Sequence, residues 1–150
     1  MSLQEKVMTE MKNAMKTKDS VGLESLRAIK SALLLAQTEK GASGGIKEAD
    51  ELKILQKLVK QRKDSASIYQ EQGRSDLAEP ELAQAAVIEK FLPKQLGREE
   101  IEGVVLEVIS QTGAEGMKDM GKVMGLVTKK LAGQADGKTI SAIVREKLSS

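Results

Sequence analysis

Three lysines and two glycines in the segment 117–131 combine residue types that suit the binding of phosphate groups. Successive residues of an α-helix lie about 100° apart, which places Lys118, Lys122 and Lys129 within about 40° of one another. Gly121 and Gly125 flank this stripe. Ammonium groups beside bare backbone can contact a phosphate chain without steric obstruction. The pattern therefore suits a nucleic-acid-binding surface, although lysine runs on helices are more often simply solvated faces.

The same two glycines also allow a purely structural interpretation. Each glycine inside a helix costs about 1 kcal/mol relative to alanine, so the pair needs a reason. Small residues four positions apart let a neighbouring helix, such as the last one, approach closely. Both alternatives stay open on the sequence alone.

Charge is unevenly distributed along the chain. The 150 residues carry a net charge of only +2, from 24 Lys plus Arg and 22 Asp plus Glu. From Lys118 to the end there are seven basic and three acidic residues, a local charge of +4 (7 − 3). Lys138 belongs to this basic segment and is a further candidate phosphate contact.

The residue types that are missing exclude several classes of function. The chain has no His, Cys or Trp, one Tyr and one Phe. It therefore has no Ser-His-Asp triad, cysteine nucleophile, Cys/His zinc site or disulfide framework. So few aromatic rings also argue against a surface that stacks several bases.

Helical periodicity accounts for nearly the whole chain, and no period-2 strand pattern or internal repeat is present. A glycine-rich loop is expected at 41–45, and Pro80 is expected to bend or delay the fourth helix. We predict an all-α fold with helices at 3–17, 21–38, 48–72, 75–91, 98–111, 117–131 and 138–148.

A break at Leu92-Pro93 through Gly97 predicts a boundary between two parts, because the residue before proline avoids the α region. We expect residues 1–94 to form an antiparallel helical bundle or hairpin. Residues 95–150 are expected to form a small three-helix domain.

Arg62 projects from the apolar face of the predicted helix 48–72. A buried arginine normally needs an acidic partner. We therefore expect a structural ion pair with Glu81 or Glu89, with a functional role for Arg62 as the alternative.

No bound metal, cofactor or membrane is expected. The acids at Glu99, Glu100 and Glu102 are interpreted as residues that favour a helix start. The longest apolar run, Ala32 to Ala36, is far shorter than a membrane span, and no signal-peptide pattern is present, which favours a cytoplasmic location.

Several motifs resemble the hallmarks of the YqeY family, and together they extend over essentially the whole chain. They are Arg62-Lys-Asp-Ser65, Gly73-Arg-Ser-Asp-Leu77, Phe91-Leu-Pro-x-Gln-Leu96, Lys118-Asp-Met-Gly-Lys-Val-Met-Gly125, Gly133-Gln-Ala-Asp136-Gly and Ile140-x-x-Ile143-Val144-x-x-x-Leu148.

The C-terminal third is also similar to the tail domain of the GatB component of the glutamyl/aspartyl-tRNA amidotransferase. The resemblance implies an all-α fold in two parts and a link to tRNA, since that tail is a helical module that contacts tRNA. Amide transfer in that enzyme occurs elsewhere in the complex. The family label would attach carbon–nitrogen ligase activity with glutamine as amido-nitrogen donor.

Three hypotheses follow for function. The first is an accessory module that binds tRNA, alone or with proteins of tRNA aminoacylation or amidation, through the basic C-terminal part. The second is an enzyme that transfers ammonia from glutamine, which the lack of Cys and of a phosphate-binding loop disfavours. The third is an interaction scaffold that presents Lys53, Lys57 and Lys60 to an acidic partner or to a second copy of the chain, with an oligomeric state that the sequence leaves open.

Overall fold

The computed structural model describes residues 2–39 and 45–149, and within these ranges it is helical with no strand. The predicted all-α fold is confirmed. The glycine-rich loop expected at 41–45 lies, except for Gly45, outside the described residues. The chain divides into two compact units, Met1–Leu92 (unit 1) and Pro93–Ser150 (unit 2), with the division two residues before the boundary expected from sequence.

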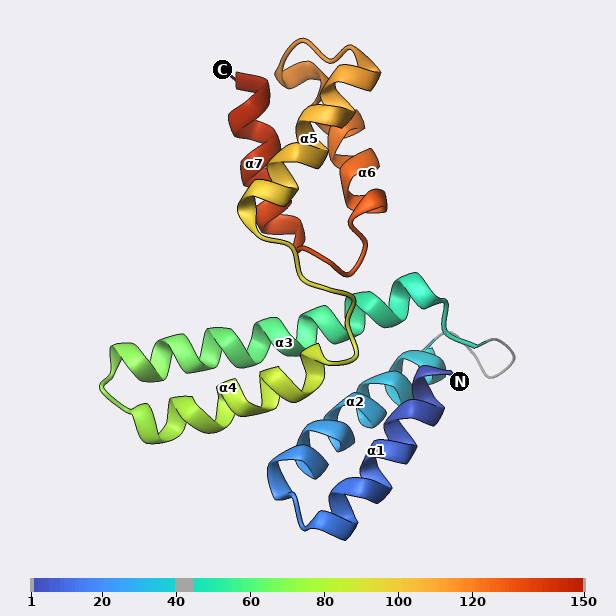
Figure 1. Ribbon diagram of the computed structural model, residues 1–150, viewed down its shortest axis with the longest axis vertical. Coiled ribbons are helices and arrows are strands. Elements are labelled where there is room, and N and C mark those ends of the chain that lie inside the picture. The colour runs from blue at the N-terminus through green and yellow to red at the C-terminus, as the bar shows by residue number, and fades with distance from the viewer. Residues whose placement is uncertain (1, 40–44, 150) are drawn as a thin grey trace. The chain divides into compact units, whose positions relative to one another are not determined.

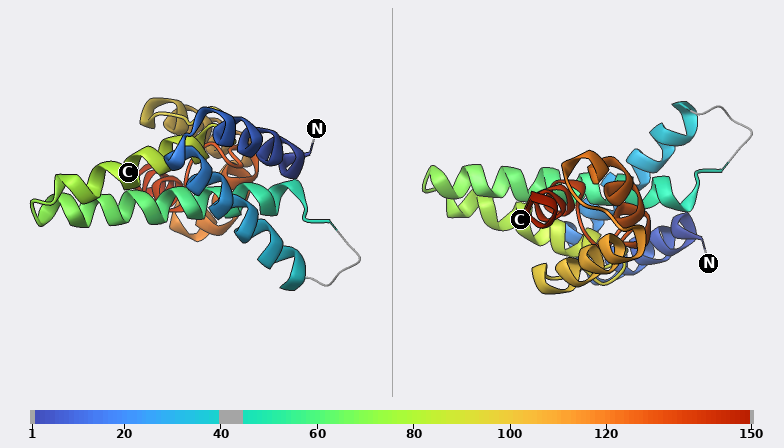
Figure 2. Two further views of the ribbon diagram at one scale, coloured as in Figure 1. Left: turned by 90° about the horizontal axis from the view of Figure 1, so that it is seen from below. Right: turned by 90° about the horizontal axis from the view of Figure 1, so that it is seen from above.

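Unit 1 is built from two antiparallel helical hairpins. Helices α1 (Leu3–Thr17) and α2 (Ser20–Glu39) form the first, and α3 (Glu48–Glu71) and α4 (Ser75–Glu89) form the second. Figures 1 and 2 show α3 and α4 running side by side. The shared core is aliphatic, as the composition requires; its most deeply buried members are Val7, Ile29, Leu33, Leu55 and Ile88.

Local signals set the helix ends in unit 1. Ser2 and Glu5 form a capping box at the start of α1, and the Asp19 carboxylate accepts from the Gly22 N–H at 2.9 Å at the start of α2. Gly73, after α3, has φ +72°, which favours glycine. Pro80 lies inside α4, which nevertheless begins at Ser75, so the expected delay does not occur.

Arg62 has a different partner from the one expected. Its Nε donates to Gln84 Oε1 at 3.0 Å and its Nη1 to the Leu58 carbonyl oxygen at 3.1 Å. Glu89 instead pairs with Lys63 at 2.5 Å. The predicted ion pair of Arg62 with Glu81 or Glu89 is therefore wrong. The guanidinium is only partly buried, so neutral oxygen acceptors suffice to satisfy it.

Unit 2 is a three-helix assembly of α5 (Arg98–Thr112), α6 (Met120–Lys130) and α7 (Gly137–Ser149), with the short 3₁₀ helix η1 (Met117–Asp119) before α6. Each of the three α-helices contributes two or more fully buried aliphatic side chains at spacings of three and four. The core residues are Ile101, Val105, Val108, Val123, Val127, Leu131, Ile140, Ile143, Val144 and Leu148.

The segment 117–131 is not one continuous α-helix. Its first turn is the 3₁₀ helix, closed by a hydrogen bond from the Asp119 N–H to the Gly116 carbonyl at 3.0 Å. A 3₁₀ helix turns about 20° more per residue than an α-helix. The projection of Lys118 onto one continuous α-helix with Lys122 and Lys129 therefore does not hold in its first turn, while Lys122 and Lys129 share α6.

No helix within residues 2–39 and 45–149 is long and apolar enough to cross a bilayer.

Ile143→Ala tests whether unit 2 has a core of its own. Ile143 is fully buried, so its truncation should destabilise unit 2 by about 2–5 kcal/mol. Amide hydrogen exchange followed by mass spectrometry should show faster exchange in peptides of α5 to α7 and little change in α1 to α4. Leu106→Ala, at a side chain that is 50% exposed, is the control and should cost less than about 1 kcal/mol. Equal acceleration in both units would contradict separate cores.

Candidate nucleic-acid interface

The candidate lysines of unit 2 are exposed and uncompensated. Lys118, Lys122, Lys129 and Lys138 are all exposed. Among the described residues, no ion pair engages any of the four, whereas several other basic residues have acidic partners. Their ammonium groups are therefore available to an anionic ligand.

The three acids of the segment are held by other donors. Asp119 Oδ2 accepts from the Glu115 N–H at 3.0 Å, and Asp136 Oδ1 accepts from the Thr139 N–H at 2.6 Å. Glu146 binds the Arg98 guanidinium. None of these three carboxylates forms an ion pair with Lys118, Lys122, Lys129 or Lys138.

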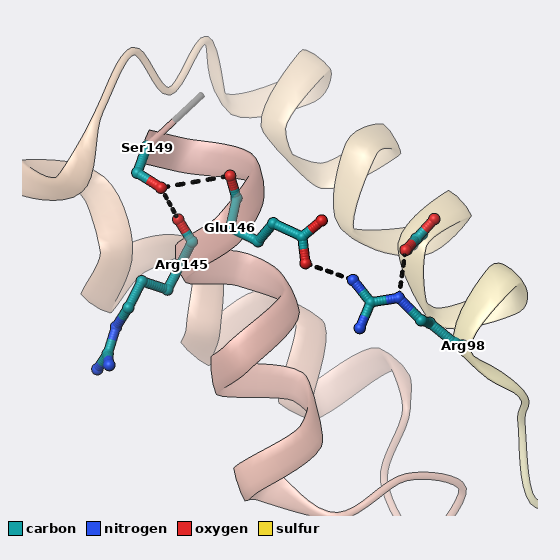
Figure 3. A network of polar contacts seen from close by, with 5 residues as sticks. Arg98, Arg145, Glu146 and Ser149 are labelled. Atoms are coloured by element: carbon teal, nitrogen blue, oxygen red, sulfur yellow. Dashed lines mark hydrogen bonds and ion pairs between the residues drawn. The ribbon is translucent and has the colours of Figure 1, made fainter.

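Arg98 joins the first turn of α5 to α7. Figure 3 shows its guanidinium next to the Glu146 carboxylate. Its Nε also lies 2.7 Å from Glu102 Oε1. The hydrogen bond to Glu146, followed by that to Glu102, raises the pKa of Arg98 above its ordinary value. Because the network is exposed, its main effect is to orient the side chains rather than to add stability.

The two glycines of α6 do not serve helix packing. A Cβ atom built at Gly121 or Gly125 would meet no neighbouring atom within 4 Å, and both residues are exposed. The interpretation of this pair as a close-packing site for the last helix is therefore wrong. The glycines leave a strip of accessible backbone beside Lys122.

The structure does not gather all of the predicted site residues at one point. Gly121, Lys122 and Gly125 lie in the first half of α6, and Lys129 lies in its last turn. Lys138 is in the first turn of α7, and Figure 1 shows that α6 ends and α7 begins at the same end of unit 2. The lysines are therefore arranged along α6 and around its end, as an extended surface rather than a pocket.

Lys130 is a basic residue that the sequence argument left out. It is exposed, and its Nζ lies 3.8 Å from Glu107 Oε1 and 3.5 Å from Gln111 Oε1 on α5. Its charge is partly compensated, so it contributes less to an anion-binding surface than Lys129. No simple sequence signal separates these two adjacent lysines.

No group of three or more acidic side chains within the described ranges is arranged to hold a metal ion.

One of the three lysines in the scaffold hypothesis has an acidic partner: Lys60 pairs with Asp64 at 2.8 Å. Lys53 and Lys57 are the other two lysines on that face of α3.

Alanine at Gly121 or Gly125 should stabilise unit 2. The added methyl group meets open space, and alanine has the higher helix propensity, so each substitution should add up to about 1 kcal/mol. Thermal unfolding followed by circular dichroism measures the change. Gly133→Ala is the contrast: Gly133 has φ +77°, so a side chain at this position should destabilise the protein. A loss of stability at Gly121 or Gly125 would revive the packing interpretation.

Comparison with known proteins gives a family and several relatives. The family described as "Yqey-like protein" matches residues 4–148. A glutamyl-tRNA(Gln) amidotransferase subunit of Thermococcus gammatolerans is 33% identical over 103 residues, which cover 66% of this chain but 16% of that subunit. "Altered inheritance of mitochondria protein 41, mitochondrial" is 28% identical in Pyrenophora tritici-repentis over 144 residues, or 94% of this chain and 78% of that protein.

The same mitochondrial protein in Meyerozyma guilliermondii is 33% identical over 124 residues, which cover 79% of this chain and 62% of the relative. The chain therefore spans a small part of the amidotransferase subunit and most of the Pyrenophora protein. The family match extends over both units and includes all six motifs noted in the sequence. The chain belongs to the YqeY family.

Proposed function

We propose that this chain is an accessory module whose unit 2 binds the phosphate backbone of a structured RNA, with tRNA as the first RNA to test. The observation that carries the proposal is the set of four exposed, uncompensated lysines of unit 2, of which Lys122 lies beside an open strip of glycine backbone. Phosphate oxygens can approach that strip closely because no side chain covers it. Lysines on either side then supply the charge.

The chemistry of this surface favours contact with phosphates over the reading of bases. Unit 2 contains no Phe, Tyr or Trp, so it has no ring on which a base could stack. Lysines that contact phosphates position a nucleic acid without reading its sequence. Recognition of one RNA class then depends on its shape, on the spacing of its phosphates, or on a partner protein.

Two comparisons connect this proposal to tRNA. One relative carries glutamyl-tRNA(Gln) in its name, and the match covers 66% of the present chain. A second, from Aeropyrum pernix, has the same name and is 40% identical over 65 residues. A tRNA, or a protein that handles tRNA, is therefore the partner we propose.

We propose no catalytic step for the chain itself. Release of ammonia from glutamine needs an activated nucleophile, and the sequence has no Cys and no amidase-like Gly/Ser-rich core for a Ser-Ser-Lys relay. The carbon–nitrogen ligase label of the family would then describe a reaction carried out by a larger assembly. Glutamate release from glutamine by the purified protein, with ATP and tRNA present, would contradict this part of the proposal.

Removal of three lysines should weaken RNA binding and its salt dependence together. In Lys118→Ala/Lys122→Ala/Lys129→Ala, each lost phosphate contact should reduce the slope of log K against log salt concentration by about 0.9. Filter binding of tRNA at several salt concentrations measures both quantities.

The matched control is Lys30→Ala/Lys53→Ala/Lys57→Ala, which removes the same charge from exposed positions of unit 1. The proposal expects this control to keep most of the wild-type affinity and slope. Equal losses in the two triple variants would show that general charge, and not unit 2, binds RNA. Absence of tRNA binding by the wild-type chain would end the proposal.

Bulk on the glycine strip should weaken binding without removing charge. Gly121→Leu/Gly125→Leu places two side chains over the exposed backbone while keeping α6 helical, so the affinity for tRNA should fall although the protein remains folded. Circular dichroism checks folding, and Ala142→Leu, at an exposed position of α7, is the control. Unchanged affinity would show that phosphates do not approach the glycines.

A further inference from the structure

Two motifs of the sequence that the proposed site does not use meet in unit 2. Gln95 belongs to Phe91-Leu-Pro-x-Gln-Leu96, and Gly133 and Gln134 belong to Gly133-Gln-Ala-Asp136-Gly. Gln95 Nε2 donates to the Gly133 carbonyl oxygen at 2.7 Å although the residues are 38 positions apart. The segment that enters α5 therefore lies directly against the loop between α6 and α7.

Two further hydrogen bonds close the same contact. Gln134 Nε2 donates to the carbonyl oxygen of Lys94 at 3.3 Å, and the Leu96 N–H donates to the carbonyl oxygen of Gln134 at 2.9 Å. Gln95 Nε2 also reaches the Pro93 carbonyl at 2.9 Å, which holds its side chain in place. We call these four hydrogen bonds of Gln95, Leu96 and Gln134 the amide clamp.

The clamp brings a lysine from a distant part of the sequence to the end of the candidate interface. Gln134, one of the residues of the clamp, lies in the loop between α6 and α7. Lys129 is in the last turn of α6 before this loop, and Lys138 is in the first turn of α7 after it. The backbone of Lys94 touches Gln134, and the side chain of Lys94 is 80% exposed. Lys94 thus lies beside the loop that joins Lys129 of α6 to Lys138 of α7.

The charged groups around Lys94 leave most of its charge available. Glu100 Oε2 is 4.0 Å from Lys94 Nζ, at the limit of an ion pair, and both side chains are more than half exposed. Such a pair is weak and screened by salt. The other carboxylate beside the loop, Asp136, is held by the Thr139 N–H, and Glu99 is exposed on the first turn of α5.

From this geometry we infer that Lys94 is a further phosphate-binding residue of unit 2, and that Gln95 is the positioning residue that holds it at the α6–α7 loop. The inference rests on the proposed function and extends it. It adds a residue outside the basic C-terminal segment, and it assigns a role to a glutamine whose side-chain amide binds the Pro93 and Gly133 carbonyl oxygens.

Lys94→Ala tests the first half of the inference. It should reduce tRNA affinity and lower the salt slope by about 0.9, the value for one phosphate contact. Lys90→Ala is the matched control, because Lys90 is exposed only four residues earlier but belongs to unit 1. Folding is not at risk, since the Lys94 side chain is exposed and makes only the weak contact with Glu100.

A double-mutant cycle tests the second half. Gln95→Ala should weaken tRNA binding when Lys94 is present and have little further effect in Lys94→Ala, because Gln95 acts through that lysine. In Lys118→Ala, a change in η1 before the start of α6, the effect of Gln95→Ala should be undiminished. A role limited to stability would give equal effects in all three backgrounds.

The possible failures are distinguishable. If Lys118→Ala/Lys122→Ala/Lys129→Ala loses affinity and Lys94→Ala does not, the inference on Lys94 is wrong and the proposed function stands. If Lys94→Ala loses affinity but the cycle is additive, the positioning role of Gln95 is wrong. If the wild-type chain binds no tRNA, the proposed function fails and this inference fails with it.

Discussion

The burial of one face of α6 is the constraint on which the candidate interface depends. Val123 and Val127 are fully buried in the core of unit 2, against side chains of α5 and α7. That packing sets the rotation of α6 and leaves Gly121, Lys122 and Gly125 on its exposed side. The surface therefore needs no specific polar contact to orient it, because aliphatic burial does so.

Polar contacts decide which charges of unit 2 are compensated. The Asp136 carboxylate accepts from the Thr139 N–H in the first turn of α7, the Asp119 carboxylate accepts from the Glu115 N–H in the loop before η1, and Glu146 binds Arg98. None of the three acids pairs with Lys118, Lys122, Lys129 or Lys138. The sequence count of seven basic and three acidic residues gives the excess of positive charge in this segment. It does not show which lysines lack an acidic partner, and only the structure does.

Periodicity was sufficient to predict the helices, because their apolar stripes repeat at spacings of three and four and the chain has almost no competing strand signal. The same reasoning failed where a tertiary contact or a local hydrogen bond determines the partner of a side chain or the type of helix. Arg62 binds Gln84 because the fold brings a neutral acceptor within reach. The 3₁₀ start before α6 depends on the bond from the Asp119 N–H to Gly116, and the open space at Gly121 depends on where α7 packs.

The amide clamp shows why motif positions can be recognised in a sequence before their role is understood. Gln95 and Gly133 are 38 residues apart, and no periodic pattern relates them. Their contact links the entry of unit 2 to the turn at which two of its helices meet. Two motifs of the family thus have a structural role, because their residues contact each other. The same contact places Lys94 beside the α6–α7 loop, although Lys94 belongs to no basic run in the sequence.

The central claim is that unit 2 binds RNA through α6 and its surrounding lysines. An NMR titration of isotopically labelled protein with tRNA tests it most directly, because the backbone amide signals of Gly121 and Gly125 report on the exposed strip itself. We predict that the largest perturbations fall on these glycines and on Lys94, Lys122, Lys129 and Lys138, and that they decrease as salt is raised. Perturbations concentrated in α1 to α4, or none at all, would contradict the claim.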